Sequence, residues 1–274
     1  MRVAVQHVTR LEFAGDVAES IMDVRLGPLD DSHQRTQRFH LRWEPHGHVR
    51  RYADGFGNTA HLLTSIRSHG FVQVSAESEI ETQLSDPFAL PEFAPQPLGP
   101  LEHADGLNPS PLIPPLPQLA ELATPFRHLE PFEAVRRLSE LIHHRFEYQP
   151  GVTDVTTSVA DVVHGGRGVC QDFAHVLIGL CRAIEIPARY VSGYIVTANV
   201  GGPSRGGGAS HAWAEAFTPS HGWRGFDPTN NLVANDRYIK VAVGRDYRDV
   251  PPTRGTYRGA VVGNLGVAVS TRVL

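Results

Sequence analysis

The cysteine at position 170 stands between a glycine-rich turn and an apolar stretch with helical spacing, in "GGRGVCQDFAH" (165–175). If a helix begins at Cys170, the sulfur lies at the positive end of the helix dipole, where the thiolate is favoured over the thiol. A cysteine nucleophile also needs a base, usually a histidine that a third polar group orients. Cys170 is therefore a candidate nucleophile if the fold brings such a histidine close to it.

His211 and Asp227 are the candidate base and orienting acid, because they begin and end the two strands of a predicted hairpin. If 219–221 forms the loop, Thr218 pairs with Gly222, and His211 lies diagonally across from Asp227 on the same face. A loop one residue longer would reverse the alternation of side chains unless a bulge restored it. Asp227 could also cap the turn at "DPTN", with or without a role beside the histidine.

The second half of the chain has the elements that would position these residues. The stretch 170–186 is apolar around most of its circumference, which is typical of a helix buried inside a domain. The patterns predict helices followed by antiparallel strands. The predicted helices are 131–148 and 170–186, and the predicted strands are 188–196, 211–217, 222–227, 237–247 and 259–274.

The first half is predicted to be all β. The segment "QRFHLRWE" (37–44) alternates cleanly, and "DGFGN" (54–58) is typical of a turn. Between Pro87 and Pro117 lie 10 of the 21 prolines, a density that favours an extended crossing segment. The predicted fold class is α+β: a sandwich-like domain over 1–100, a proline-rich linker to about 117, and a second domain over 118–274.

Four stretches of the second half resemble the transglutaminase-like superfamily, a branch of the papain-like thiol enzymes: "GRGVCQDFAH", "IPARYVSGY", "SHAWAEAF" and "GWRGFDPTNN". The first half, with "DGFGN", is similar to the bacterial transglutaminase N-terminal domain, and the tail "VAVGRDYRDVPPTRG" is also similar to bacterial members. The resemblance implies a papain-like core, with a buried helix packed on an antiparallel sheet. It makes Cys170 the nucleophile, His211 the general base and acid, and Asp227 the orienting acid.

The chemistry that this triad implies is acyl transfer through a thioester. The backbone N–H of Cys170, at a helix N-terminus, is a natural donor to the oxyanion. Gln171 and Asp172 are assigned to support of this region, and Asp172 also favours the helix dipole. The second oxyanion donor stays open, with His164 as a nearby candidate.

Further residues are expected to support or line the site. Tyr190, Tyr194 and Trp213 are expected in the core or the cleft wall, and His175 is expected to pack. Cys181 lies on the apolar stripe of its helix and is predicted to be core. The predicted cleft-lining residues are Trp213, Tyr194, Arg245 and Asp246, and the last two are expected to pair with each other.

Composition argues against several other classes of protein. A formal charge of −4 gives no electrostatic case for binding nucleic acid or an anionic membrane. The first residues lack the apolar block of a signal peptide, and apolar runs such as "VLIGL" are too short to span a bilayer. Two cysteines do not make a disulfide framework. We expect a soluble, cytoplasmic protein.

No metal or cofactor is expected. His143 and His144 are adjacent, so on a helix they point in different directions, and no H-x-x-x-H or C-x-x-C pair occurs. The glycine-rich loop 201–210 lacks the Lys-Ser/Thr of a phosphate loop and is interpreted as a rim beside His211. No acidic loop suited to calcium is visible.

The favoured hypothesis is a thiol-dependent hydrolase, a cysteine protease or amidase, that acts on peptide or isopeptide-type amides of a protein or peptide substrate. The alternatives are a protein-glutamine gamma-glutamyltransferase, an amine N-acyltransferase, and a non-catalytic peptide-binding module on the same fold. The intact triad argues against the binding module, because binding alone does not need it. The sequence leaves the substrate and the oligomeric state open.

Overall fold

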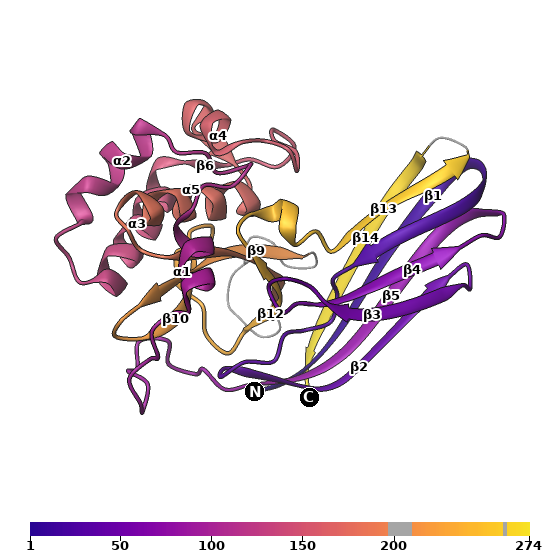
Figure 1. Cartoon of the computed structure of the whole chain (residues 1–274), viewed down its shortest axis with the longest axis horizontal. Coiled ribbons are helices and arrows are strands. Elements are labelled where there is room, and N and C mark those ends of the chain that lie inside the picture. The colour runs from indigo at the N-terminus through magenta and orange to yellow at the C-terminus, as the bar shows by residue number, and fades with distance from the viewer. Residues whose placement is uncertain (197–209, 260–261) are drawn as a thin grey trace.

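Two sheets organise the computed structural model, which describes residues 1–196, 210–259 and 262–274. A strongly curved antiparallel sheet forms one end of the molecule, and helices packed on a second antiparallel sheet form the other (Figure 1). The predicted α+β fold class, with an all-β first domain and a helix-on-sheet second domain, is confirmed.

The first domain is an antiparallel half-barrel of seven strands, in a single curved sheet rather than two stacked ones. Its strand order is β2-β5-β1-β4-β3, with β13 and β14 added along β1. The alternation in 37–44 is seen in β2, where Trp43 is buried between exposed neighbours. The strands are β1 (Arg2–Val24), β2 (Gln34–Glu44), β3 (His48–Ala53), β4 (Thr59–Ser65), β5 (His69–Thr82), β13 (Thr253–Gly259) and β14 (Val262–Val273).

The C-terminal strands belong to this first sheet, which corrects their assignment to the second domain. Strand β1 is 23 residues long, and its second edge would stay unpaired if only local hairpins covered it. β14 pairs along the first half of β1 and β13 along the second half. The last strand of the chain therefore lies beside the first. In Figure 1 the two yellow strands run beside indigo β1, and the two termini lie close together.

The second domain has the predicted order of helices followed by strands. Its sheet has the order β11-β10-β9-β8-β12, and a short parallel pair, β6 with β7, lies apart from it. The helices are α1 (Pro100–Leu107), α2 (Pro117–Ala123), α3 (Pro131–Arg145), α4 (Val159–Gly165) and α5 (Cys170–Ala183), with 3-10 turns η1 (Thr124–Phe126) and η2 (Tyr247–Asp249). The strands are β6 (Glu147–Tyr148), β7 (Arg167–Gly168), β8 (Ala188–Ile195), β9 (His211–Thr218), β10 (Gly222–Asp227), β11 (Leu232–Val233) and β12 (Tyr238–Gly244).

Helix α1 lies inside the proline-rich segment that we predicted to be wholly extended. Pro100 occupies its first turn, where proline costs nothing because the first N–H groups of a helix have no partner inside it. The prediction was therefore right that proline avoids the interior of a helix, but it did not allow for a helix whose first residue is a proline.

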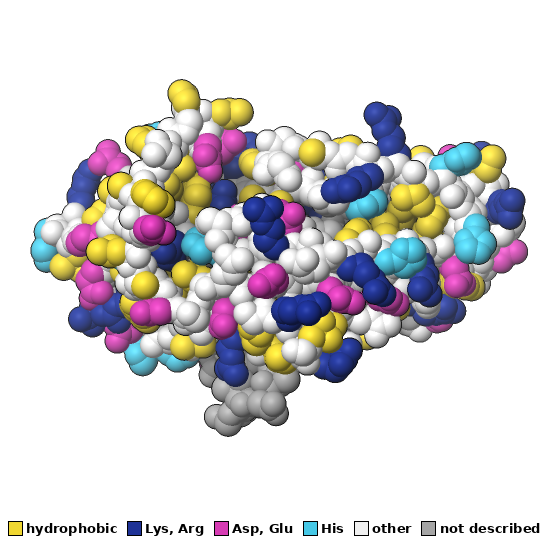
Figure 2. Space-filling view, turned by 90° about the horizontal axis from the view of Figure 1, so that it is seen from below, with side chains coloured by type: hydrophobic (Ala, Val, Ile, Leu, Met, Phe, Trp, Pro, Cys, Tyr) yellow, Lys and Arg dark blue, Asp and Glu magenta, His cyan; other side chains and the backbone are white. Residues whose placement is uncertain are grey.

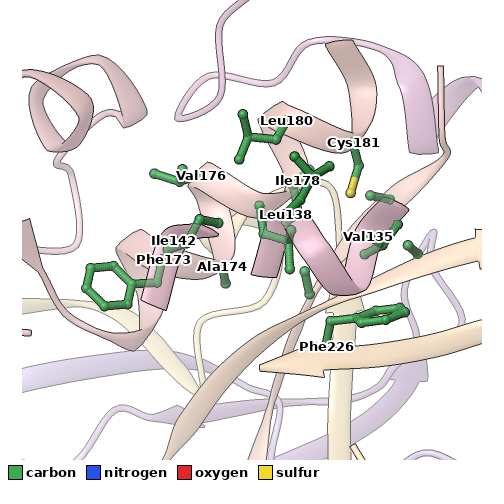
Figure 3. Close-up of a cluster of buried hydrophobic side chains, with 14 of the residues drawn as sticks. Val135, Leu138, Ile142, Phe173, Ala174, Val176, Ile178, Leu180, Cys181 and Phe226 are labelled. Atoms are coloured by element: carbon green, nitrogen blue, oxygen red, sulfur yellow. The ribbon is translucent and has the colours of Figure 1, made fainter. Parts of the chain in front are cut away.

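Helix α5 is buried along nearly its whole length, from Gln171 to Cys181. Its apolar side chains pack against α3 on one side and the sheet on the other, in a cluster that also includes Phe226 of β10, drawn with them in Figure 3. Each fully buried Leu, Ile or Phe in this cluster stabilises the fold by about 1.5–3 kcal/mol. Cys181 is one of these core side chains, as predicted, and burial raises the pKa of its thiol to about 12.

The two domains share an apolar contact between β1, β5 and β14 on one side and β8 and β12 on the other. It joins Val3, Val5, Ile80 and Val269 to Tyr194, Val196, Ile239 and Val241. On the face drawn in Figure 2, acidic and basic side chains are interspersed over the surface. Within the described ranges, no helix has both the length and the apolar character that crossing a bilayer requires.

Candidate active site

The hairpin of β9 and β10 has the predicted register. Thr218 pairs with Gly222, and the ladder continues to Phe226 opposite Ala214. His211 and Asp227 therefore meet as expected: His211 Nε2 lies 2.8 Å from Asp227 Oδ2, and both side chains are buried. The register alone brings together two residues that are 16 positions apart.

The Asp227 carboxylate accepts five hydrogen bonds from described residues. Oδ1 accepts the backbone N–H groups of Thr229 at 2.9 Å and Asn230 at 3.3 Å, so Asp227 also caps the "DPTN" turn. Oδ2 accepts His211, the Asn230 side-chain amide at 2.7 Å and the Tyr238 hydroxyl at 2.8 Å. Burial alone would raise the pKa of Asp227, but the charge of His211 and these bonds hold it below its usual value.

The imidazole of His211 lies between Asp227 and Cys170. With Nε2 bonded to the carboxylate, Nδ1 is buried and has no partner of ordinary hydrogen-bond geometry in the described part of the chain. The Cys170 thiol is nevertheless close enough to raise the pKa of the imidazole. Burial would lower the pKa of His211, but the charge and hydrogen bond of Asp227, followed by the interaction with Cys170, raise it to about 10. Cys170 itself is partly exposed.

The glycine-rich turn before Cys170 shapes the start of α5. Gly166 ends α4 in the left-handed conformation, at φ 67°, which glycine adopts without strain. Asp172 reaches back to accept the backbone N–H of Val169 at 2.8 Å and the hydroxyl of Thr153 at 2.6 Å. Gly168 leaves room for that carboxylate, since a Cβ there would lie 2.7 Å from Asp172 Oδ2. Asp172 thus supports the helix start by capping it, as expected.

We expect Gly168→Ala to lower the free energy of unfolding by about 1–3 kcal/mol, because the added methyl group must displace the Asp172 cap. Gly165→Ala is the matched control: no atom lies within 4 Å of its added Cβ, and alanine favours a helix. Urea titration of both variants measures the difference. Equal stability of the two would contradict this function for Gly168.

Trp213 lies in the core, one of its two expected places, and contacts His211. It is buried and stacks on the His211 ring, with ring centres 6.3 Å apart. Its indole is packed tightly against the backbone of Gly193 and Gly225, where an added Cβ would lie 2.5 Å and 2.9 Å from indole atoms. The two glycines of neighbouring strands therefore make room for this ring.

Tyr194 takes the core position that was one of its two expected places, and Arg245 and Asp246 have partners other than each other. Tyr194 is buried at the domain contact, where its hydroxyl lies 2.8 Å from His7 Nδ1. Arg245 pairs with Asp249, four positions along the same turn, at 2.9 Å rather than with Asp246. Asp246 is buried and accepts the backbone N–H groups of Leu112 and Arg248. The predicted Arg245–Asp246 pair is wrong, because the carboxylate of Asp246 is used to hold backbone.

The other residues named from the sequence near Cys170 differ in their exposure. Gln171 is buried, and its Nε2 has no hydrogen-bond partner among the described residues. His164 is exposed in the last turn of α4. His175 is buried, accepts the Tyr247 backbone N–H at 3.1 Å, and has a pKa lowered to about 4 by burial, so it is neutral at pH 7. Tyr190 is buried, and burial and the charge of Cys170 raise its pKa.

Two residues in contact with Asp227 were not found from the sequence, Tyr238 and the side chain of Asn230. Tyr238 begins a strand that the pattern predicted, but nothing local indicates that this strand lies at the triad. Asn230 belongs to the "DPTNN" motif and lies three positions after Asp227, a spacing that could have indicated this contact.

Within the described ranges, no group of three or more His, Cys, Asp or Glu side chains is arranged to hold a metal. Except for Ser210, the predicted glycine-rich loop 201–210 lies outside the described residues.

Comparison with known proteins gives the family. Residues 120–228 match the transglutaminase-like superfamily, and residues 3–81 match the bacterial transglutaminase-like N-terminal region. An uncharacterized protein from Mycobacterium leprae is 32% identical over 275 residues, which cover 98% of this chain and 97% of that protein. The chain belongs to the transglutaminase-like superfamily.

Two further proteins share the fold of this chain or part of its sequence. The crystal structure of a candidate cysteine protease from Cytophaga hutchinsonii has a TM-score of 0.78 and 25% identity, and covers 100% of this chain and 91% of that one. A protein-glutamine gamma-glutamyltransferase from Pseudomonas aeruginosa is 30% identical over 162 residues, which are 52% of this chain and 23% of that protein. The resemblance noted from the motifs is confirmed.

Proposed function

We propose that this transglutaminase-like protein is a thiol-dependent hydrolase that cleaves peptide or isopeptide-type amide bonds. The observation that carries the proposal is the buried His211–Asp227 pair, at 2.8 Å, beside a partly exposed Cys170 at the start of a helix. A pKa of about 10 keeps His211 protonated at neutral pH, and an imidazolium stabilises a neighbouring thiolate.

In the acylation step, the Cys170 thiolate attacks the amide carbonyl carbon, and the backbone N–H of Cys170 faces the developing oxyanion. His211 gives its proton to the leaving nitrogen, the C–N bond breaks, and a thioester remains. The acylated sulfur carries no charge, so the part of the raised pKa of His211 that comes from Cys170 is lost. Neutral imidazole then takes a proton from water, which attacks the thioester and releases the acid and the thiolate.

A transferase is the second candidate, favoured by the similarity of half the chain to a protein-glutamine gamma-glutamyltransferase. The two reactions share acylation and differ in what attacks the thioester. With casein or a cell extract as acyl donor, the hydrolase should incorporate ¹⁸O from labelled water into new carboxylates and leave a fluorescent primary amine unincorporated. Amine incorporation with release of ammonia would establish the transferase instead.

The acyl-enzyme proposal itself is tested by alkylation with iodoacetamide, followed by peptide mass spectrometry. We expect Cys170 to react at pH 6–7 much faster than an ordinary free cysteine, and Cys181, buried with a pKa of about 12, to be protected in the folded protein. Equal reactivity of the two cysteines, or an ordinary pH profile for Cys170, would exclude an activated thiol.

A further inference from the structure

The outer edge of β12 is closed by two amide side chains of the first domain. β12 is an end strand in the order of its sheet, so its outward N–H and C=O groups need partners from elsewhere. Gln34 accepts the Lys240 N–H and donates to the Lys240 carbonyl, each at 2.8 Å. Asn58 accepts the Val243 N–H and donates to the Val243 carbonyl, also at 2.8 Å each. Each amide takes the place of a residue in a neighbouring strand.

Both amides are held rigidly by the first domain. Asn58 is fully buried and donates to Asp54 at 3.0 Å, while Asp54 also accepts the backbone N–H groups of Phe56 and Asn58. The positive φ of Gly57, 79°, completes this "DGFGN" turn. Gln34 is buried as well, and its backbone N–H is held by Asp31 at 3.0 Å.

Two more contacts hold the same strand. The Thr82 hydroxyl donates to the Asp236 carbonyl at 2.7 Å, just before β12 begins. The Lys240 ammonium is bonded to Asp31 of the first domain at 2.6 Å and to Glu215 of β9. We call the contacts at Asp236, Lys240 and Val243 the β12 clamp.

Tyr238 lies between the first two contacts of the β12 clamp. Its hydroxyl donates to Asp227 Oδ2 at 2.8 Å, the same oxygen that His211 contacts. Its ring packs against Trp213, with ring centres 5.2 Å apart, and lies 6.5 Å from that of His211. The backbone that carries this tyrosine is therefore fixed from the first domain, and its side chain ends at the triad carboxylate.

We propose that the first domain positions the triad through the β12 clamp, with Gln34, Asn58 and Tyr238 as positioning residues for Asp227 and His211. The inference rests on the proposed function for the roles of the triad. Its physical reason is that small displacements of an acid–base pair cost large factors in rate, up to about 10²-fold for 1 Å. A carboxylate with five donors has little freedom only while each donor stays in place.

The test uses the full chain and measures the alkylation rate of Cys170 by iodoacetamide against pH. Tyr238→Phe removes one donor from Asp227, so the carboxylate is more easily protonated and orients the imidazolium less well. We expect the rate at pH 6 to fall about three- to tenfold, the worth of one hydrogen bond, and the acid limb to move to higher pH. Tyr194→Phe is the matched control, because it removes an equally long buried hydroxyl contact at the domain interface without touching the triad.

Gln34→Ala tests the clamp itself, because Gln34 contacts no triad residue. We expect the same direction of shift as in Tyr238→Phe, and a double variant with less effect than the product of the two single ones, since both act through one hydrogen bond. If Gln34→Ala does not fold, Thr82→Val removes the hydroxyl bond to the Asp236 carbonyl, together with a longer one to the Met1 carbonyl inside the first domain, and should shift the profile in the same sense.

The outcomes separate the inference from the function on which it rests. A reactive Cys170 whose pH profile is unchanged in Tyr238→Phe, Gln34→Ala and Thr82→Val would overturn the positioning role alone. A shift in Tyr194→Phe equal to that in Gln34→Ala would also overturn it, because any loss at the domain contact would then be sufficient. An unreactive Cys170 in the unsubstituted protein would instead contradict the proposed function.

Discussion

Cys170→Ala is expected to lower kcat on the cognate amide by a factor on the order of 10⁶, because no other side chain can form the thioester. What remains is the catalysis supplied by binding and by backbone donors at the start of α5. The helix start should keep its structure, since the Asp172 cap bonds Val169 and Thr153 and does not use the sulfur. The measurement is single-turnover kinetics together with a check that the far-UV circular dichroism is unchanged.

Cys181→Ala is the control for this loss. Cys181 is fully buried on the same helix and has a thiol pKa of about 12, so it is not nucleophilic at neutral pH. Its loss should cost about 1 kcal/mol of stability through a small cavity and leave kcat unchanged. Retention of activity by Cys170→Ala, or its loss in Cys181→Ala alone, would remove Cys170 from the mechanism.

The meeting of His211 and Asp227 could be predicted from the sequence because it is a local event. A three-residue loop sets the hairpin register, and the alternation of side chains along a strand then decides which residues share a face. The apolar pattern of 170–186 likewise predicted a buried helix, although α5 ends at Ala183. Such features depend on neighbours within about twenty positions, which a sequence pattern records.

The pairing of distant segments could not be predicted in the same way. Strands β13 and β14 were recognised as strands, but their partner, β1, lies at the other end of the chain. The "DGFGN" turn was similarly read as a turn, whereas its Asn58 side chain closes the edge of a strand 185 residues later. Single-sequence patterns give the type of an element and carry no signal for which far element it contacts.

The partners of polar residues near the site could not be predicted from local patterns either. Arg245 and Asp246 are neighbours in the sequence and suggested a pair, yet adjacent side chains diverge, and Arg245 finds Asp249 one turn later. Tyr194 belongs to a motif that implies the site, but its side of β8 faces the other domain. A motif therefore identifies the strand, and the packing of both sheet faces decides which of its side chains reach the cleft.

Asp227→Asn is expected to lower kcat by about 10⁴-fold, although it changes one atom. In the native site both carboxylate oxygens face donors: Oδ1 faces two backbone N–H groups, and Oδ2 faces His211, Asn230 and Tyr238. An asparagine must therefore direct its NH₂ group at donors in either orientation. The backbone N–H groups cannot turn, so the NH₂ should take the Oδ2 position, where His211 must present an unprotonated Nε2.

That tautomer places the proton of His211 on Nδ1, so Nδ1 can no longer take a proton from Cys170. Loss of the Asp227 charge also lowers the pKa of His211 from about 10, and the imidazolium is then lost at lower pH. The basic limb of the kcat/KM profile should move down in pH by the same amount as the imidazole titration followed by ¹⁵N NMR.

Asp246→Asn is the matched control, because Asp246 is an equally buried carboxylate that accepts backbone N–H groups and does not contact His211. It should reduce stability while the folded protein keeps the native pH profile. If Asp227→Asn gave a full rate with an unmoved basic limb, the carboxylate would have no part in holding the imidazolium. The five donors around Asp227 would then serve only to close the "DPTN" turn, and the pairing at 2.8 Å would be structural.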